Sequence, residues 1–250
     1  MRTLCMGDVV SDTGVEYVCR VLPTMIRELK ADFVIINAEN SNPRNGITKD
    51  EAQRLRYCGA DAITTGNHAF RQRASYDFFD SCEYLLRPAN FSDSAPGRGW
   101  QTFDTPFGDV CVVNLIGQIY MDNSADNPFR TADRILRQVE AKYIFVDFHA
   151  EATSEKKAMG YWLDGRVSCV FGTHTHVQTA DERILPRGTA YITDVGMCGA
   201  ADSVLGARKG QIMDKFVRNV SSPYTPAAEE PMINAILTDT DAATVQRIYK

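Results

Sequence analysis

The chain has 250 residues, of which 44% are hydrophobic and 24% charged, and its formal net charge at pH 7 is −5. This composition is typical of a globular protein with a substantial core, and the acidic balance argues against nucleic acid as the main partner. No run reaches the roughly 18 apolar residues that a membrane-spanning helix requires. An acid as early as Asp8 is not typical of a secretory signal peptide, so neither membrane insertion nor export is expected.

The first third of the sequence alternates between strand-like and helix-like segments. Strands are expected at residues 3–6, 32–37 and 60–64, and helices at residues 15–30 and 48–58. Thr48 followed three residues later by Glu51 predicts a capping box at the start of the second helix. Near-continuous apolar strands that alternate with helices indicate a parallel sheet covered on both faces.

The remaining two thirds contain hairpins as well as single strands. We expect strands at residues 100–103, 110–115, 143–148, 167–171, 189–192, 232–237 and 243–249, and a helix at about residues 153–162. The first two and the last two of these strands are expected to form antiparallel hairpins, and residues 221–231 form a proline-rich loop. The pattern predicts one α/β domain over residues 1–250, with mixed β-sheets in a sandwich flanked by helices.

The seven cysteines are an odd number and contain no Cys-x-x-Cys pair. A disulfide framework is therefore not expected, and a reducing cytoplasm is the predicted location.

All four histidines lie in short segments flanked by glycine, asparagine or acidic residues. They are His68 in Gly-Asn-His, His149 in Asp-Phe-His-Ala-Glu, and His174 and His176 in Gly-Thr-His-Thr-His. Imidazole is the commonest metal-ligating side chain and the usual proton carrier near neutral pH. The histidines therefore predict a metal-assisted hydrolytic site.

Other polar candidates also follow the expected strands, where the carboxyl ends of parallel strands form a shared edge. The full candidate set is Asp8, Glu39, Asn40, Asn67, His68, His149, His174 and His176. Oxygen and nitrogen donors without a thiolate suit Fe, Mn or Zn, and Glu39 is the central candidate to bridge two ions. If residues 174–176 are extended, both histidines project from one side and can serve adjacent metals.

His68 has a different predicted role. It follows the candidate ligand Asn67, but neighbouring side chains in a turn after a strand usually point apart. A histidine that lies beside the metals without binding them can donate a proton to a departing alkoxide. Asn40 could complete the coordination of one metal or contact the substrate.

Seven stretches in order resemble the calcineurin-like metallophosphoesterases, and more closely their bacterial YmdB-like branch. They are Gly7–Val10, Asn37–Asn40, Thr65–His68, Leu86–Asn90, Asp147–Glu155, Gly172–Glu182 and Thr193–Met197. The resemblance implies that one metal is bound by Asp8, Glu39, Asn40 and His176, and the other by Glu39, Asn67, His149 and His174. It also implies His68 as the proton donor.

The same resemblance implies a chemistry. Members of this branch use two divalent or mixed-valence transition metal ions, iron in the first place and manganese or zinc as alternatives. A bridging hydroxide would attack a small phosphodiester substrate such as a 2′,3′-cyclic nucleotide. Self-association into a homo-oligomer is also implied. Two departures from the broader superfamily are Val10, where a histidine is usual, and Glu39, where an aspartate is usual.

Several alternatives remain open from the residues alone. Asp8 could be a turn or N-cap residue, and Asn67 could cap a helix that starts near Ala69. Arg98, in a loop that follows the rigid turn around Pro88, could reach a phosphate or remain solvated. Glu151 and Glu155 could orient metal-bound histidines or begin a helix.

Two other functions compete with phosphodiester hydrolysis. One is a regulatory protein that keeps the metal site and binds a nucleotide or a partner with little turnover. The other is a nuclease or RNA-processing partner, which the acidic balance disfavours.

Overall fold

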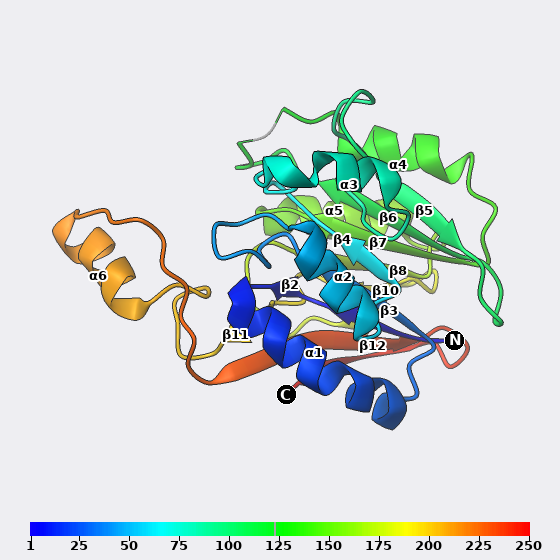
Figure 1. Cartoon of the computed structure of the whole chain (residues 1–250). Helices are drawn as coiled ribbons and strands as arrows, with labels where there is room; N and C mark the ends of the chain where they lie inside the picture. Colours follow the sequence, from blue (N-terminus) through cyan, green and yellow to red (C-terminus); the bar gives the residue numbers. More distant parts are fainter. Residues whose placement is uncertain (123) are drawn as a thin grey trace.

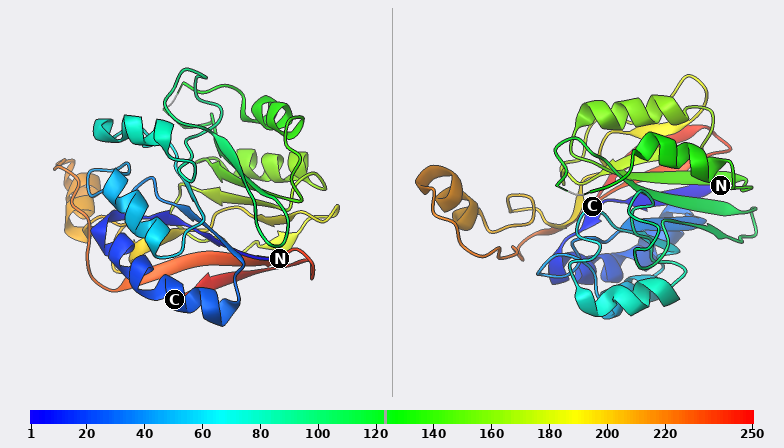
Figure 2. Two further views of the ribbon diagram at one scale, coloured as in Figure 1. Left: turned by 45° about the vertical axis from the view of Figure 1, so that its right-hand side comes forward. Right: turned by 90° about the horizontal axis from the view of Figure 1, so that it is seen from above.

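The computed structural model describes residues 1–122 and 124–250. Two β-sheets pack face to face, and helices cover the outer face of each sheet (Figures 1 and 2). The predicted α/β sandwich of mixed sheets flanked by helices is therefore confirmed.

The first sheet has the strand order β2-β11-β12-β1-β3-β4, with β13 paired to β12. Its strands are β1 (Arg2–Met6), β2 (Asp8–Val9), β3 (Phe33–Asn37), β4 (Ala62–Thr64), β11 (Met197–Ala200), β12 (Pro231–Asp239) and β13 (Thr244–Tyr249). The neighbours β1, β3 and β4 are parallel, as the alternation in the first third predicts. The sheet as a whole is mixed, because β12 of the C-terminal hairpin pairs antiparallel with β1.

The second sheet has the strand order β5-β6-β7-β8-β10-β9. Its strands are β5 (Trp100–Phe103), β6 (Val110–Ile116), β7 (Tyr143–His149), β8 (Cys169–Thr173), β9 (Arg183–Ile184) and β10 (Ala190–Ile192). The four inner strands are parallel, and the two edge strands are antiparallel. Since Ile116, His149 and Thr173 lie in register, β6, β7 and β8 end at the same level.

Six α-helices occur in the described residues. They are α1 (Ser11–Leu29), α2 (Lys49–Tyr57), α3 (Tyr76–Ser81), α4 (Pro128–Leu136), α5 (Thr153–Leu163) and α6 (Lys209–Arg218), with a short 3₁₀ turn at Arg73–Ser75. The capping box of α2 is confirmed: Glu51 N donates to Thr48 Oγ1, and Thr48 N donates to Glu51 Oε2 at 2.7 Å. Helix α1 begins four residues earlier than expected, where Ser11 N bonds the carbonyl of Asn40.

Three apolar clusters hold the layers together. The cluster between the sheets includes Cys5 and Ile35 from the first sheet and Phe145 and Phe171 from the second, all fully buried. A second cluster packs α1 and α2 on the first sheet, and a third packs α4 and α5 on the second. Burial of this kind is the main stabilising contribution to a fold of this size.

Helix α6 differs from the other helices. It projects away from the sandwich on a long excursion of the chain between β11 and β12 (Figures 1 and 2), and none of its residues is buried. Its apolar side chains Met213, Phe216 and Val217 are 56%, 72% and 70% exposed. Within the described ranges, no helix combines the length and apolarity that a bilayer span requires.

Candidate metal centre

The eight candidate residues lie together, on loops from both sheets. Glu39 and Asn40 follow β3, Asn67 and His68 follow β4, His149 ends β7, and His174 and His176 follow β8. Asp8 follows β1 after Gly7, as predicted, and also begins the short strand β2. The carboxyl ends of parallel strands therefore bring distant segments to one edge, as predicted.

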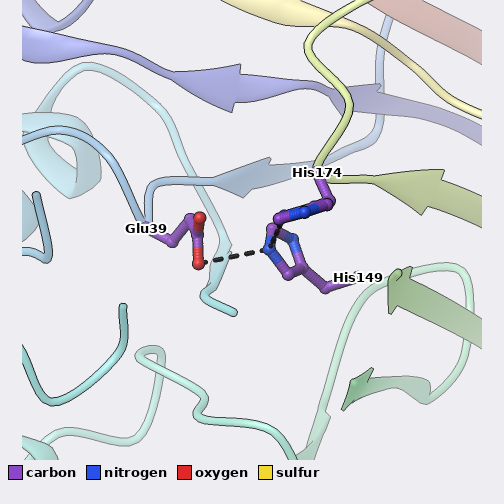
Figure 3. A group of neighbouring side chains, drawn as sticks. All are labelled: Glu39, His149 and His174. Carbon is purple, nitrogen blue, oxygen red and sulfur yellow. Dashed lines mark hydrogen bonds and ion pairs between the residues drawn. The ribbon is translucent and has the colours of Figure 1, made fainter. Parts of the chain in front are cut away.

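Glu39, His149 and His174 form the centre of the group (Figure 3). Their potential ligand atoms all lie within 4.8 Å of one another. His149 Nε2 lies 3.2 Å from Glu39 Oε2, 3.1 Å from His174 Nδ1 and 2.9 Å from Asn67 Oδ1. Three types of metal donor, a carboxylate, an amide oxygen and imidazoles, thus converge at one point.

A second set of donors lies on the other side of the Glu39 carboxylate. Glu39 Oε1 accepts a hydrogen bond from Asn40 Nδ2 at 2.9 Å, and this amide nitrogen lies 3.2 Å from His176 Nε2. Asp8 Oδ2 accepts from the backbone of His174 at 2.9 Å. Glu39 thus lies against His149 with Oε2 and against Asn40 and His68 with Oε1, an arrangement compatible with a carboxylate that bridges two ions.

The ring of His68 lies beside the centre and is 27% exposed. Its Nδ1 lies 3.0 Å from Asn40 Oδ1 and 3.2 Å from Glu39 Oε1, and its backbone N–H donates to Glu39 Oε2. The expectation that Asn67 and His68 point apart is wrong, because Asn67 Nδ2 lies 3.2 Å from His68 Nε2. Residues 67–70 form a turn, so Asn67 does not cap a helix near Ala69.

Gly66 is required for this close packing. A Cβ at this position would lie 2.2 Å from His149 Cδ2 and 2.3 Å from Glu39 Oε2, so any side chain would collide with the two residues. The glycine of the Gly-Asn-His segment therefore allows the backbone to approach the donor atoms.

A layer of buried polar residues positions His149. Its Nδ1 lies 2.9 Å from Thr173 Oγ1, which in turn donates to Asp147 Oδ1 at 2.7 Å. Asp147 Oδ2 also accepts from Asn37 at 2.9 Å and from Thr64. Outer partners of this kind fix the orientation of a ligating histidine. Sequence reasoning missed these roles, since no local pattern shows that Asn37, Asp147 and Thr173 meet.

A buried ion pair anchors the loop that carries His174 and His176. Lys156 Nζ lies 2.5 Å from Asp194 Oδ2 and donates to the carbonyl of Thr173 at 2.7 Å. The same carboxylate oxygen accepts from the backbone N–H of Thr175 at 3.1 Å. Sequence reasoning did not assign Lys156 a role, although Asp194 lies in one of the motifs that carry the family resemblance.

The 174–176 segment is not extended, so the geometry assumed for its two histidines is wrong. His174 and His176 have φ angles of 103° and 65°, a backbone conformation that residues other than glycine rarely adopt. Such strain is maintained only when surrounding contacts fix it, as the anchored loop does here. His176 nevertheless faces Asn40, and His174 faces His149, so each histidine serves a different donor set.

The two glutamates of uncertain role also have clear contacts. Glu151 Oε2 lies 3.2 Å from His174 Nε2, which supports an orienting role. Glu155 is buried in the first turn of α5 and accepts from the backbone N–H groups of Gln118 and Ile119. It therefore stabilises the loop after β6 and does not contact the candidate ligands.

Burial and mutual charge shift the titration of the central groups. Burial raises the pKa of Glu39, but the facing His149 and His68 outweigh this effect and hold it well below its ordinary value. Burial raises the pKa of Asp8. Burial lowers the pKa of His149, but Glu39 outweighs it and the pKa is about 9. Burial and the neighbouring His149 lower the pKa of His174 to about 3.

These residues fit transition metal ions. Two buried carboxylates, Asp8 and Glu39, need compensating positive charge, and within the cluster only the neighbouring histidines can supply it. Among the described residues, Asp8 Oδ1 is one of few buried side-chain atoms without a hydrogen-bond partner. A bound cation would balance the negative charge of the two carboxylates and would also give Asp8 Oδ1 a partner. Asn40 would have to turn its amide by about 180° to offer the oxygen, an exchange of amide atoms that ordinary side-chain rotation allows.

Comparison with known proteins agrees with this assignment. The sequence matches the YmdB-like protein family over residues 4–249. It is 42% identical to the 2′,3′-cyclic-nucleotide 2′-phosphodiesterase of Bacillus subtilis (strain 168), and the match covers 99% of this chain and 94% of that protein. A hypothetical protein from Thermus thermophilus has the same fold with a TM-score of 0.94 and 36% identity, over 100% of this chain and 99% of the other. A novel phosphatase from Mycoplasma pneumoniae gives a TM-score of 0.92 and 32% identity, over 100% and 93%.

The two-sheet sandwich and the cluster of carboxylate, amide and imidazole groups define a metallophosphoesterase of the calcineurin-like superfamily. Within this class, the chain belongs to the YmdB-like family. The predictions of the fold, the family and a hydrolytic enzyme are confirmed. The roles of the individual site residues stay predictions.

Proposed function

We propose that this protein is a metal-dependent phosphodiesterase that hydrolyses small phosphodiesters such as 2′,3′-cyclic nucleotides. The observation that carries the proposal is the position of Glu39, whose two oxygens face two separate donor sets. The activity of the Bacillus subtilis relative supports the substrate class.

Two metal ions fit the donor sets, with Glu39 shared between them. One set contains Asp8, Asn40 and His176, and the other contains Asn67, His149 and His174. Iron is the proposed metal, with manganese or zinc as alternatives, because the donors are oxygen and nitrogen without thiolate. When bound, such ions polarise the phosphoryl oxygens, lower the pKa of a shared water and stabilise the leaving oxygen.

His68 is the proposed general acid. Its Nδ1 lies 3.2 Å from Glu39 Oε1, so Nε2 is the ring atom from which a proton can be delivered. Water adds to phosphorus, the P–O2′ bond breaks, and the 2′ oxygen takes the proton from His68 Nε2, which leaves a 3′-phosphate. The partial exposure of the ring allows a substrate to reach it.

The decisive experiment combines metal analysis with turnover. The purified protein should contain iron, manganese or zinc and hydrolyse 2′,3′-cyclic AMP. The His68→Ala variant should keep its metal content and lose about 10²–10⁴-fold in turnover. Arg71→Ala is the matched control, because Arg71 is an exposed residue of the same loop and should leave turnover unchanged.

Two results would contradict the proposal. Turnover of His68→Ala at the wild-type rate would exclude the proton-donor role. Tight binding of the cyclic nucleotide to metal-loaded protein without hydrolysis would instead favour the regulatory alternative.

We further propose that the chain forms one domain and that the protein is cytoplasmic. We also propose that it associates with copies of itself through α6. The supporting observation is the exposed group Met213, Phe216 and Val217 on a helix without buried residues. Exposed apolar groups of this kind commonly mark protein interfaces.

A further inference from the structure

A polar cavity lies outside the metal centre and is lined by residues of β5, of the loop before it and of α4; Figure 1 shows where β5 and α4 lie. Its volume is about 360 Å³, within the range of small-molecule pockets. The loop before β5 contributes Arg87, Asp93 and Arg98, β5 contributes Trp100, and α4 and its C-terminal extension contribute Arg134 and Gln138. None of the eight candidate site residues lines it.

Arg87 is the most unusual residue of this cavity. It is only 6% exposed, and its Nη1 donates to the carbonyl of Pro88 at 2.9 Å. In the described part of the chain, the buried Arg87 Nε has no hydrogen-bond partner. Burial lowers the pKa of this guanidinium, and the charge of Asp93 only partly opposes the effect. The guanidinium of Arg87 is thus a largely buried charge without an ion-pair partner among the residues described, which is unfavourable unless an anion in the cavity compensates it.

The charges around the cavity are unbalanced. Three guanidinium groups, those of Arg87, Arg98 and Arg134, face one carboxylate, that of the exposed Asp93. Arg98 Nη1 donates to the neutral Gln101 at 2.8 Å. Over residues 1–122 and 124–250, no ion pair within 4 Å neutralises any of the three arginines. This local positive charge contrasts with the net charge of −5 of the whole chain.

The chemistry of these groups indicates the ligand. Guanidinium groups present planar pairs of N–H donors that match the oxygens of a phosphate. Several arginines around one cavity favour a doubly charged phosphate monoester over a singly charged anion. Trp100 adds an aromatic wall, and Gln138 adds an amide that can bind polar atoms of a base or sugar.

We propose that this cavity is a binding site for a phosphate monoester of about mononucleotide size, held through Arg87, Arg98 and Arg134. The site also gives a role to Arg87 of the Leu86–Asn90 motif, which does not contact the candidate ligands. It makes Arg98 of the loop a phosphate ligand and not a solvated side chain. Binding here does not depend on turnover at the metal centre.

Trp100 supplies a direct signal for the test. The chain has two tryptophans, so a Trp162→Phe variant leaves Trp100 as the only one. Metal-loaded protein in this background is titrated with 3′-AMP, with adenosine and with inorganic phosphate, and indole fluorescence is recorded. We expect a saturable change with 3′-AMP but not with adenosine.

Arginine variants separate this cavity from the metal centre, which can also bind phosphate. The Arg98→Gln/Arg134→Gln double variant should bind at least about tenfold more weakly by the Trp100 signal. Its hydrolysis of 2′,3′-cyclic AMP, if present in the parent, should persist. Arg137→Gln is the matched control, because Arg137 is an exposed arginine just after α4 that does not line the cavity. Thermal unfolding checks that each variant folds.

Each result of the fluorescence titrations either supports or overturns the proposed binding site. Saturation by inorganic phosphate as well as by 3′-AMP supports the site and identifies free phosphate as a sufficient ligand. Saturation by 3′-AMP alone supports the site and assigns it to the nucleotide. No saturable change with either probe at about 10 mM overturns the proposal. A change that survives in the Arg98→Gln/Arg134→Gln variant overturns it as well.

Discussion

The metal centre and helix α6 differ most in which side chains they bury: the centre encloses charged groups, whereas α6 exposes apolar ones. In the centre, the charged groups Asp8 and Glu39 are fully enclosed, and buried partners within the chain compensate them only in part, since Asp8 Oδ1 has no hydrogen-bond partner among the described residues. On α6, apolar groups such as Phe216 face solvent and have no core to join. The difference teaches that folding builds the first region from side chains that the chain itself brings together, whereas it leaves the apolar side chains of the second without contacts in the core.

Among the substitutions predicted for these regions, one in the buried Lys156–Asp194 pair beside the centre should lower the free energy of unfolding most. Lys156→Met leaves the carboxylate of Asp194 buried without its cation, since both side chains are only 1% exposed. We expect the free energy of unfolding to fall by about 3–5 kcal/mol, measured by urea denaturation. Lys157→Met is the control, because Lys157 is half exposed and should change stability by less than about 0.5 kcal/mol. Equal effects of the two variants would show that the Lys156–Asp194 pair is not an anchor.

Asp147→Asn tests the layer that orients His149. The amide cannot accept all the hydrogen bonds that Thr173, Asn37 and Thr64 donate to the carboxylate. We expect a loss of about 1–3 kcal/mol in the free energy of unfolding and a loss of about 10–100-fold in metal affinity. Metal titration of the variant measures the second effect. Asp104→Asn, at an exposed position, should change neither quantity, and wild-type metal affinity in Asp147→Asn would contradict the orienting role.

Asp181 is intermediate between these two regions in exposure, since its side chain is 29% exposed. Burial raises its pKa, but hydrogen bonds from Thr193 and Thr179 outweigh burial and lower it below the ordinary 3.8. A lowered folded-state pKa contributes stability that is present above pH 3.8 and is lost as the pH falls through the folded-state value. Asp181→Asn should therefore cost less than about 1 kcal/mol at pH 7, with the difference vanishing under acid. Unfolding curves at about pH 7 and about pH 3 test this, and a difference that grows at low pH would reverse the assigned sign.

Phe216→Ser should have the smallest effect on stability, within about 0.5 kcal/mol, because Phe216 is 72% exposed. Its effect should appear instead in sedimentation velocity, as a shift toward the monomer. Unchanged sedimentation of the variant would mean that this face of α6 is not the self-association surface.

Local patterns were sufficient to predict most strands and a set of candidate site residues that the fold brings together. The capping box at Thr48 and the apolar runs of β3 and β7 are local signals that tertiary packing did not override. Helix α4 also carried a local signal, an Asn127 N-cap followed by Pro128, that sequence reasoning overlooked. Helix α6 has no buried face, so core packing gives no reason for its position.

Non-local geometry could not be predicted in the same way. The pairing of β12 with β1 joins segments more than 200 residues apart, and no periodicity reports it. The positive φ angles of His174 and His176 depend on Asp194 and Lys156, which lie elsewhere in the chain. The cavity around Arg87 likewise combines a loop with a helix beyond β6. Such features follow from the assembled fold and not from the residues of one segment.

The pairing of β12 between β1 and β11 also has a consequence for biosynthesis. In the first sheet, β11 and β12 lie between β1 and β2, the strand that begins with Asp8. The hydrogen-bonded strand order from β1 to β2 therefore cannot form until residues 231–239 have left the ribosome. Contacts of such high sequence separation form slowly, because the loop entropy must be lost before they contribute. The nascent chain therefore carries the candidate ligand residues before the first sheet can be completed by β12.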